Sequence, residues 1–162
     1  TGRKQLSLVP EEQMMQLGKD VFSYFGLGCR NVSKVFVPSG YQFDTLYKSW
    51  EGFKDVVNHH KYCNNYDYQK SILLVSQTPF LDNGFILIQE SDKLVSPIAV
   101  LYFDYYNSVD DLTNKLDLIQ DKLQCIVGES HLSNVKFGQT QCPDLEDYAD
   151  RVDTMRFLNN LV

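Results

Sequence analysis

The chain has 162 residues, 43% of them hydrophobic, and its 15 basic and 21 acidic side chains give a formal net charge of −6. This length and hydrophobic share suit one soluble domain with a substantial core, and no apolar run approaches the roughly 20 residues of a membrane-spanning helix. The acidic balance argues against a nucleic-acid-binding protein, because phosphate contacts depend on clustered lysines and arginines.

The first predicted elements are a helix and a strand joined by a glycine-rich turn. Apolar side chains recur at steps of three and four residues over 11–25, which predicts a helix with acids in its first turn. Gly26 and Gly28 then allow a sharp turn. The β-branched, alternating residues 32–37 predict a strand, so Cys29 lies in a tight connection between helix and strand.

The same alternation continues along the chain. Amphipathic helices are predicted over 42–57 and 109–123, whereas 71–75 either continues a helix or forms a strand. Short apolar runs predict strands at 5–9, 85–89, 98–106 and 125–128. Alternating strands and helices predict an α/β fold, with a layered, largely parallel sheet and helices on both faces.

The segment 137–162 is acidic and ends on a helical apolar pattern. Its acids lack the glycine and the ligand spacing of a calcium loop, so a solvated face is the favoured interpretation. An apolar helix at the end of a long tail needs a surface to pack on. This pattern suggests that the chain is part of a larger protein.

The cysteines are widely spaced along the chain: Cys29, Cys63, Cys125 and Cys142. No pair has the short spacing typical of zinc ligands, so no metal site is predicted. A chain with an adequate core does not need disulfides, and no signal-like apolar stretch follows the first residues. The pattern favours reduced cysteines and a cytoplasmic protein.

Cys29 is the one position with a chemical argument from the residues themselves. Cysteine reactivity rises beside positive charge or exposed backbone N–H groups, and Gly28 and Arg30 flank this cysteine. A backbone N–H at such a bend can stabilise the oxyanion of a tetrahedral intermediate. The same residues are also typical of a buried structural cysteine beside a helix end, and without further information that interpretation is favoured.

The stretch 24–38, YFGLGCRNVSKVFVP, resembles the nucleophile region of the aldehyde dehydrogenase superfamily. In that superfamily a helix ends in a Gly-x-Cys segment and leads into a strand. The chain most closely resembles the acyl-CoA reductase branch, which includes the fatty-acid reductases of bacterial bioluminescence. Stretches 58–68, 82–85 and 137–155 are similar to the same branch, so the resemblance covers nearly the whole chain.

The resemblance implies that residues 1–162 form an aldehyde-dehydrogenase-like catalytic domain that acts on acyl-CoA. Cys29 would form an acyl-cysteine thioester, which NADPH or NADH would reduce to an aldehyde. Gly28 and the amide of Cys29 would support the oxyanion. The dinucleotide-binding domain, which holds most of the cofactor and a second oxyanion donor, would lie N-terminal to this chain, and a homo-oligomer is compatible with the resemblance.

The chain departs from the family pattern in two places. Hydrolytic members carry a glutamate that activates water, and the corresponding residues 2–6, GRKQL, contain none, which fits a thioester reductase. In the family a Glu-x-Phe-Gly-Pro segment holds the nicotinamide ribose. Its counterpart here is 93–98, with Lys93 in place of the glutamate, and Glu90 is the candidate substitute.

His60 and Lys61 are further candidates for an acid–base role or for contact with CoA phosphates. They are equally typical of a solvated helix start. Two other classes of function remain open at this point. The first is a non-catalytic oligomerisation or partner-binding domain on the same scaffold, and the second is an aldehyde-oxidising dehydrogenase.

Overall fold

The computed structural model describes residues 11–129, 131–145, 147–148 and 152–160, which form an α/β fold around a four-stranded mixed sheet. The strands are β1 (Lys34–Pro38), β2 (Leu81–Asp82), β3 (Leu87–Glu90) and β4 (Val100–Tyr106). Their order in the sheet is β1-β4-β3-β2. Both β1 and β3 pair in parallel with β4, whereas β2 pairs antiparallel with β3. The predicted α/β class is confirmed, and the sheet has an antiparallel edge that the sequence did not predict.

The helices predicted over 11–25, 42–57 and 109–123 are present, and each is followed by a short 3-10 segment. The long helix that begins at His60 was not predicted over its full length. The helices are α1 (Glu11–Phe22), η1 (Ser23–Gly26), α2 (Asp44–Trp50), η2 (Glu51–Asn58), α3 (His60–Val75), α4 (Val109–Asp117), η3 (Gln120–Lys122) and α5 (Thr154–Asn159). The ambiguous segment 71–75 completes α3. No helix of the described residues has the length and apolar character that crossing a membrane requires.

The prediction of a strand at 125–128 is wrong. This segment forms a single parallel bridge between Val127 and Val135, and its residues are only half-buried. Asn134 and Val135 both donate backbone hydrogen bonds to Ile126 O, so the chain closes a local loop and does not join the sheet. The run predicted as a strand at 5–9 lies outside the described residues.

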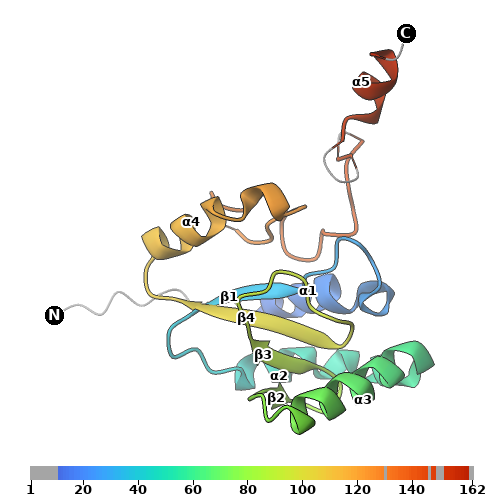
Figure 1. Ribbon diagram of the computed structural model, residues 1–162, viewed down its shortest axis with the longest axis vertical. Coiled ribbons are helices and arrows are strands. Elements are labelled where there is room, and N and C mark those ends of the chain that lie inside the picture. The colour runs from blue at the N-terminus through green and yellow to red at the C-terminus, as the bar shows by residue number, and fades with distance from the viewer. Residues whose placement is uncertain (1–10, 130, 146, 149–151, 161–162) are drawn as a thin grey trace, which may run out of the picture.

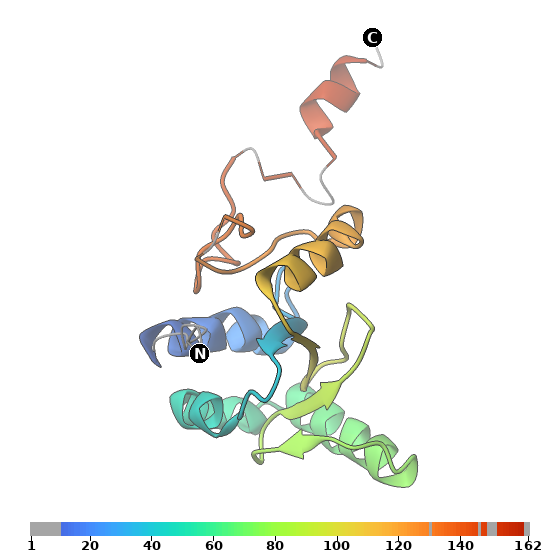
Figure 2. The same ribbon diagram turned by 90° about the vertical axis from the view of Figure 1, so that its left-hand side faces the viewer.

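Alternate residues of β4 contact different layers of the molecule. Phe103 packs against Phe43, which precedes α2, with 4.9 Å between ring centroids. The neighbouring Asp104 faces α4, where Lys115 Nζ donates to its carboxylate at 3.2 Å. In Figure 2, α4 (gold) lies above α1 (blue) and α2 (teal). Strand β4 therefore contacts both the aromatic core and, through Asp104, the helix α4.

Trp50 joins α2 to α1 at the centre of the aromatic core. Its side chain is fully buried, and its Nε1 donates to Met14 O at 2.7 Å. Its ring meets Phe22 edge-on, with centroids 5.3 Å apart. Gly18, on the same face of α1, permits this close approach. A Cβ there would lie 2.9 Å from Trp50 Cδ1 and 2.5 Å from Phe53 Cε2.

Replacing Gly18 by alanine is therefore expected to destabilise the fold. Ala gains about 1 kcal/mol of helix propensity over Gly, and overpacking costs about 1–3 kcal/mol, so we expect a net loss of up to about 2 kcal/mol. Gly52→Ala is the matched control, because a Cβ at Gly52 has no atom within 4 Å. Urea unfolding followed by circular dichroism measures both variants. A Gly18→Ala protein as stable as Gly52→Ala would contradict the packing described above.

The C-terminal helix α5 extends away from the rest of the molecule in both views (Figures 1 and 2). The exposed fractions of Met155, Phe157 and Leu158 are 61%, 56% and 50%. Asp153 caps this helix by accepting from Arg156 N at 2.9 Å. A helix of this length is marginal by itself in water, and its apolar side chains are largely exposed.

Candidate functional site

A left-handed turn connects α1 to the segment that carries Cys29. Tyr24, Phe25 and Gly26 have φ values of 52°, 58° and 68°. This conformation costs a residue with a side chain roughly 1–2 kcal/mol, and such strain persists only where the surroundings impose it. The helix predicted to reach Phe25 therefore ends at Phe22. The turn redirects the chain toward β1.

The left-handed turn is held against the start of α3. The rings of Phe25 and His59 stack with centroids 3.9 Å apart and planes 12° apart. His59 is also the N-cap of α3, where its Nδ1 accepts from Tyr62 N at 3.4 Å. Of the two adjacent histidines, His59 thus packs against the Cys29 segment, whereas the side chain of His60 is exposed.

Asn31 fastens the Cys29 segment to the end of α1. Its Nδ2 lies 3.0, 3.1 and 3.0 Å from the carbonyl oxygens of Asp20, Val21 and Ser23. A helix leaves its last carbonyls without intrahelical partners, and the two N–H groups of this amide are shared among the carbonyls of Asp20 and Val21 in α1 and of Ser23 just after it. Gly28 makes room for this side chain, since a Cβ at that position would lie 2.6 Å from Asn31 Oδ1.

Cys29 itself is a free, exposed thiol at this turn. None of the hydrogen bonds found within the described residues uses its backbone N–H, so that donor is open to a ligand. Arg30 points elsewhere: its Nε donates to Thr140 O at 2.7 Å, and its Nη2 lies 3.6 Å from Asp147 Oδ2. The Arg30 guanidinium is therefore bound to residues of the C-terminal segment, Thr140 and Asp147.

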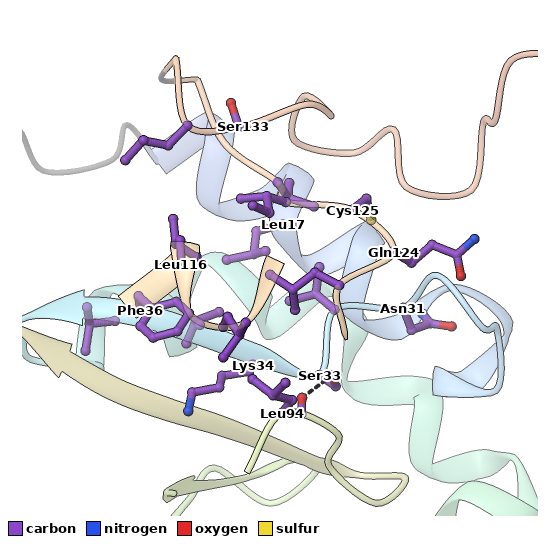
Figure 3. A pocket seen from close by; sticks show the side chains of 18 of the residues that line it. Leu17, Asn31, Ser33, Lys34, Phe36, Leu94, Leu116, Gln124, Cys125 and Ser133 are labelled. Atoms are coloured by element: carbon purple, nitrogen blue, oxygen red, sulfur yellow. Dashed lines mark hydrogen bonds between the residues drawn. The ribbon is translucent and has the colours of Figure 1, made fainter. Parts of the chain in front are cut away.

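A cavity of about 470 Å³ opens beside Cys29, between β1 and the chain that follows α4. The lining is mainly apolar and includes Leu17, Val35, Leu112, Leu116, Ile119 and Phe137. Figure 3 shows Leu17, Phe36 and Leu116 around this pocket. No Asp, Glu or His of the described residues lines it.

A smaller cavity of about 230 Å³ also has Cys29 in its lining. It is lined by Gly28, Tyr62, Ile86 and the loop 95–100, again without a described carboxylate or histidine. Ser33 Oγ donates to Leu94 O at 2.8 Å and ties this loop to the Cys29 segment (Figure 3). The stretch 93–98, which the resemblance aligns with a cofactor-contacting segment, thus contributes to the surroundings of Cys29.

The other predicted site residues lie outside these cavities. His60 and Lys61 are exposed at the start of α3, and Glu90 is exposed at the end of β3. Glu90 pairs with Phe103, which pairs with Val35, so two strand spacings of about 4.8 Å separate Glu90 from β1. The structure therefore brings Gly28 and Cys29 together but not His60, Lys61 or Glu90.

The sequence analysis missed two buried polar residues next to the site. Asp20 and Thr140 are 1% and 0% exposed, and the carboxylate of Asp20 accepts hydrogen bonds from Thr140. Asp20 lies three residues after Leu17, on the apolar face of the helix. A charged residue in that register is the signal that could have identified it.

The fit of a nicotinamide dinucleotide to these residues is poor. Such cofactors need an acceptor for the ribose and a cradle for the phosphates. The described lining of the two cavities offers no carboxylate. Its basic side chains are Arg30, Lys34 and Lys122, of which the first two donate to Thr140 O and Ser91 O. In the described part of the chain, no group of three or more His, Cys, Asp or Glu side chains could hold a metal ion.

Comparison of the chain with protein-family models, with curated proteins and with solved structures finds no match. The case for a function therefore comes from the geometry around Cys29, together with the resemblance of the sequence around it.

Proposed function

We propose that this chain is the catalytic domain of an acyl-CoA reductase, in which Cys29 accepts the acyl group of acyl-CoA. One observation carries the proposal: an exposed thiol with an open backbone N–H lies at the edge of an apolar cavity of about 470 Å³. That volume is within the range of small-molecule sites, and an apolar lining suits an acyl chain. The resemblance of 24–38 to a nucleophile region supports the same function.

The proposed acyl transfer uses groups that this chain supplies. The Cys29 thiol first gives its proton to water, and the thiolate then attacks the carbonyl carbon of the thioester, so that the electron pair of the C=O bond moves to oxygen. The N–H of Cys29 donates to this oxyanion. As the C=O bond re-forms, the bond between carbon and the CoA sulfur breaks, and the CoA thiolate leaves and takes a proton from water. Asn31 holds the turn in place throughout.

The proposal assigns the reductant, NADPH or NADH, to a separate dinucleotide-binding domain. The poor fit of the described residues to such a cofactor supports this division. Within the proposal the protein is cytoplasmic, its catalytic domain has the aldehyde-dehydrogenase-like architecture, and α5 contributes to a homo-oligomer. His60 and Lys61 are exposed and would meet CoA phosphates only outside the two cavities.

A second candidate function is a non-catalytic module that binds a partner protein. The exposed apolar side chains of α5 favour it, because Met155, Phe157 and Leu158 have no function in the acyl transfer described above. On this alternative, Cys29 would have no affinity for acyl-CoA, which gives a direct way to separate the two candidates.

Protection of Cys29 from alkylation tests the proposal. We expect saturating octanoyl-CoA to slow the reaction of Cys29 with iodoacetamide at least about fivefold, because acylation consumes the thiol. Cys142 is also a free, exposed thiol and serves as the internal control. Peptide mass spectrometry follows both sites, with octanoate as the control ligand. Equal rates at Cys29 with and without octanoyl-CoA would favour the partner-binding module.

A further inference from the structure

The carboxylate of Asp20 is enclosed by one distant segment of the chain. Its Oδ2 accepts from Gly138 N at 2.6 Å, and its Oδ1 accepts from Thr140 N at 3.1 Å and from Thr140 Oγ1 at 2.9 Å. Burying a carboxylate is costly unless hydrogen bonds replace its water. Three donors from residues 138–140 replace that water.

The segment 138–140 has a backbone suited to this carboxylate. Gly138 has a φ of 78°, and a Cβ at this position would collide with Gln16 Oε1. Thr140 is fully buried and directs both its N–H and its hydroxyl at Asp20. The segment 138–140 therefore fits against Asp20 of α1 because Gly138 adopts a left-handed conformation and Thr140 is buried.

The same residues also hold the Cys29 turn. Thr140 O accepts from Arg30 Nε at 2.7 Å, immediately after the cysteine. On the other side, Asp20 O accepts from Val32 N at 3.1 Å and from Asn31 Nδ2 at 3.0 Å. The residues that follow Cys29 are thus bonded both to Asp20 and to the segment that Asp20 anchors.

We infer that Asp20 and Thr140 are positioning residues for Cys29. Their buried hydrogen bonds fix the segment 138–140 on α1, and Arg30 transmits that fixed position to the cysteine turn. Loss of one bond should let the turn shift and should lower the reactivity of Cys29 before it unfolds the protein. This inference rests on the proposed function only in taking Cys29 as the acyl acceptor.

Thr140→Val tests the inference, because it removes the hydroxyl donor and keeps the shape of the side chain. We expect Cys29 to accept octanoyl groups from octanoyl-CoA about tenfold more slowly at saturation, since displacing a reacting group by a fraction of an ångström has effects of this size. The octanoyl-CoA concentration at half-saturation should not change. Thr140→Ser, which restores the hydroxyl, should react within about twofold of the wild-type rate.

A second readout does not depend on acyl-CoA. The ratio of the iodoacetamide alkylation rates of Cys29 and Cys63 should fall in Thr140→Val and recover in Thr140→Ser. Cys63 is the reference because it lies on α3, outside the segment that Thr140 holds. If the wild-type protein accepts no acyl group, the proposed function fails, and this ratio still decides the positioning role.

Three results would overturn the inference. The first is an unchanged ratio and acylation rate in a folded Thr140→Val protein, and the second is failure of Thr140→Ser to restore them. If Thr140→Val does not fold, Arg30→Met breaks the bond to Thr140 O from the other side. The third result that would overturn the inference is unchanged Cys29 reactivity in a folded Arg30→Met protein.

Discussion

Cys29→Ala is expected to abolish the transfer of a labelled octanoyl group from octanoyl-CoA to this protein. The thiol supplies the bond that holds the acyl group. Cys125 is the other cysteine among the described residues that line this cavity, but it is only half-exposed, and we do not expect it to replace Cys29. Retained radioactivity after gel filtration measures the transfer. Peptide mass spectrometry of the wild type should place the label on Cys29.

Cys142→Ala is the matched control for this experiment, because Cys142 is the other cysteine with an exposed free thiol. It should accept the octanoyl group at the wild-type rate, as should Cys63→Ala and Cys125→Ala. Cys29→Ser is less informative, since a serine at the same turn retains a nucleophilic oxygen. Undiminished label on the Cys29→Ala protein would remove Cys29 from the proposed function.

The octanoyl group on Cys29 is expected to be long-lived in the absence of a reductant. Hydrolysis of a thioester needs an activated water, and a positioned general base contributes about 10²–10⁴-fold. Within the described residues, neither cavity beside Cys29 is lined by a carboxylate or a histidine. The label should therefore leave the native protein no faster than it leaves the same protein unfolded in urea at the same pH.

The urea-unfolded protein controls for the intrinsic lability of the thioester, and hydroxylamine confirms the nature of the bond. Release of octanoic acid from the native protein that is a hundredfold faster would contradict the prediction. In that case one of Glu11, Glu12 or Glu90 would have to supply the base. The aldehyde-oxidising alternative would then replace the reductase.

Local patterns in the sequence were sufficient to place most of the elements. The helix starting at Glu11, the strand leading to Pro38 and the helix capped by Ser108 all follow from periodicity and from capping residues. The position of Cys29 between a helix and a strand follows in the same way. These features depend on residues that are neighbours along the chain, so the sequence reports them directly.

The details of the site depend on contacts between residues that are far apart in the sequence. The left-handed conformation of Phe25 is held in part by the stack of its ring on His59. His59 is 34 positions further along the chain, so the residues next to Phe25 do not predict this conformation. The same contact places His59 at the site in preference to His60. The run 125–128 is apolar enough for a strand, but among the described residues it forms a single bridge, Val127 with Val135.

The sequence by itself determined the alternation of helices and strands, the α/β class and the place of Cys29 in a turn before β1. Only the tertiary structure decided which groups surround that cysteine. Asp20 and Thr140 are 120 positions apart in the sequence and form a hydrogen bond. The cavity beside Cys29 forms between α1, β1 and the chain after α4. Periodicity shows which side of an element is buried. The partner on that side is set by the packing of the whole chain.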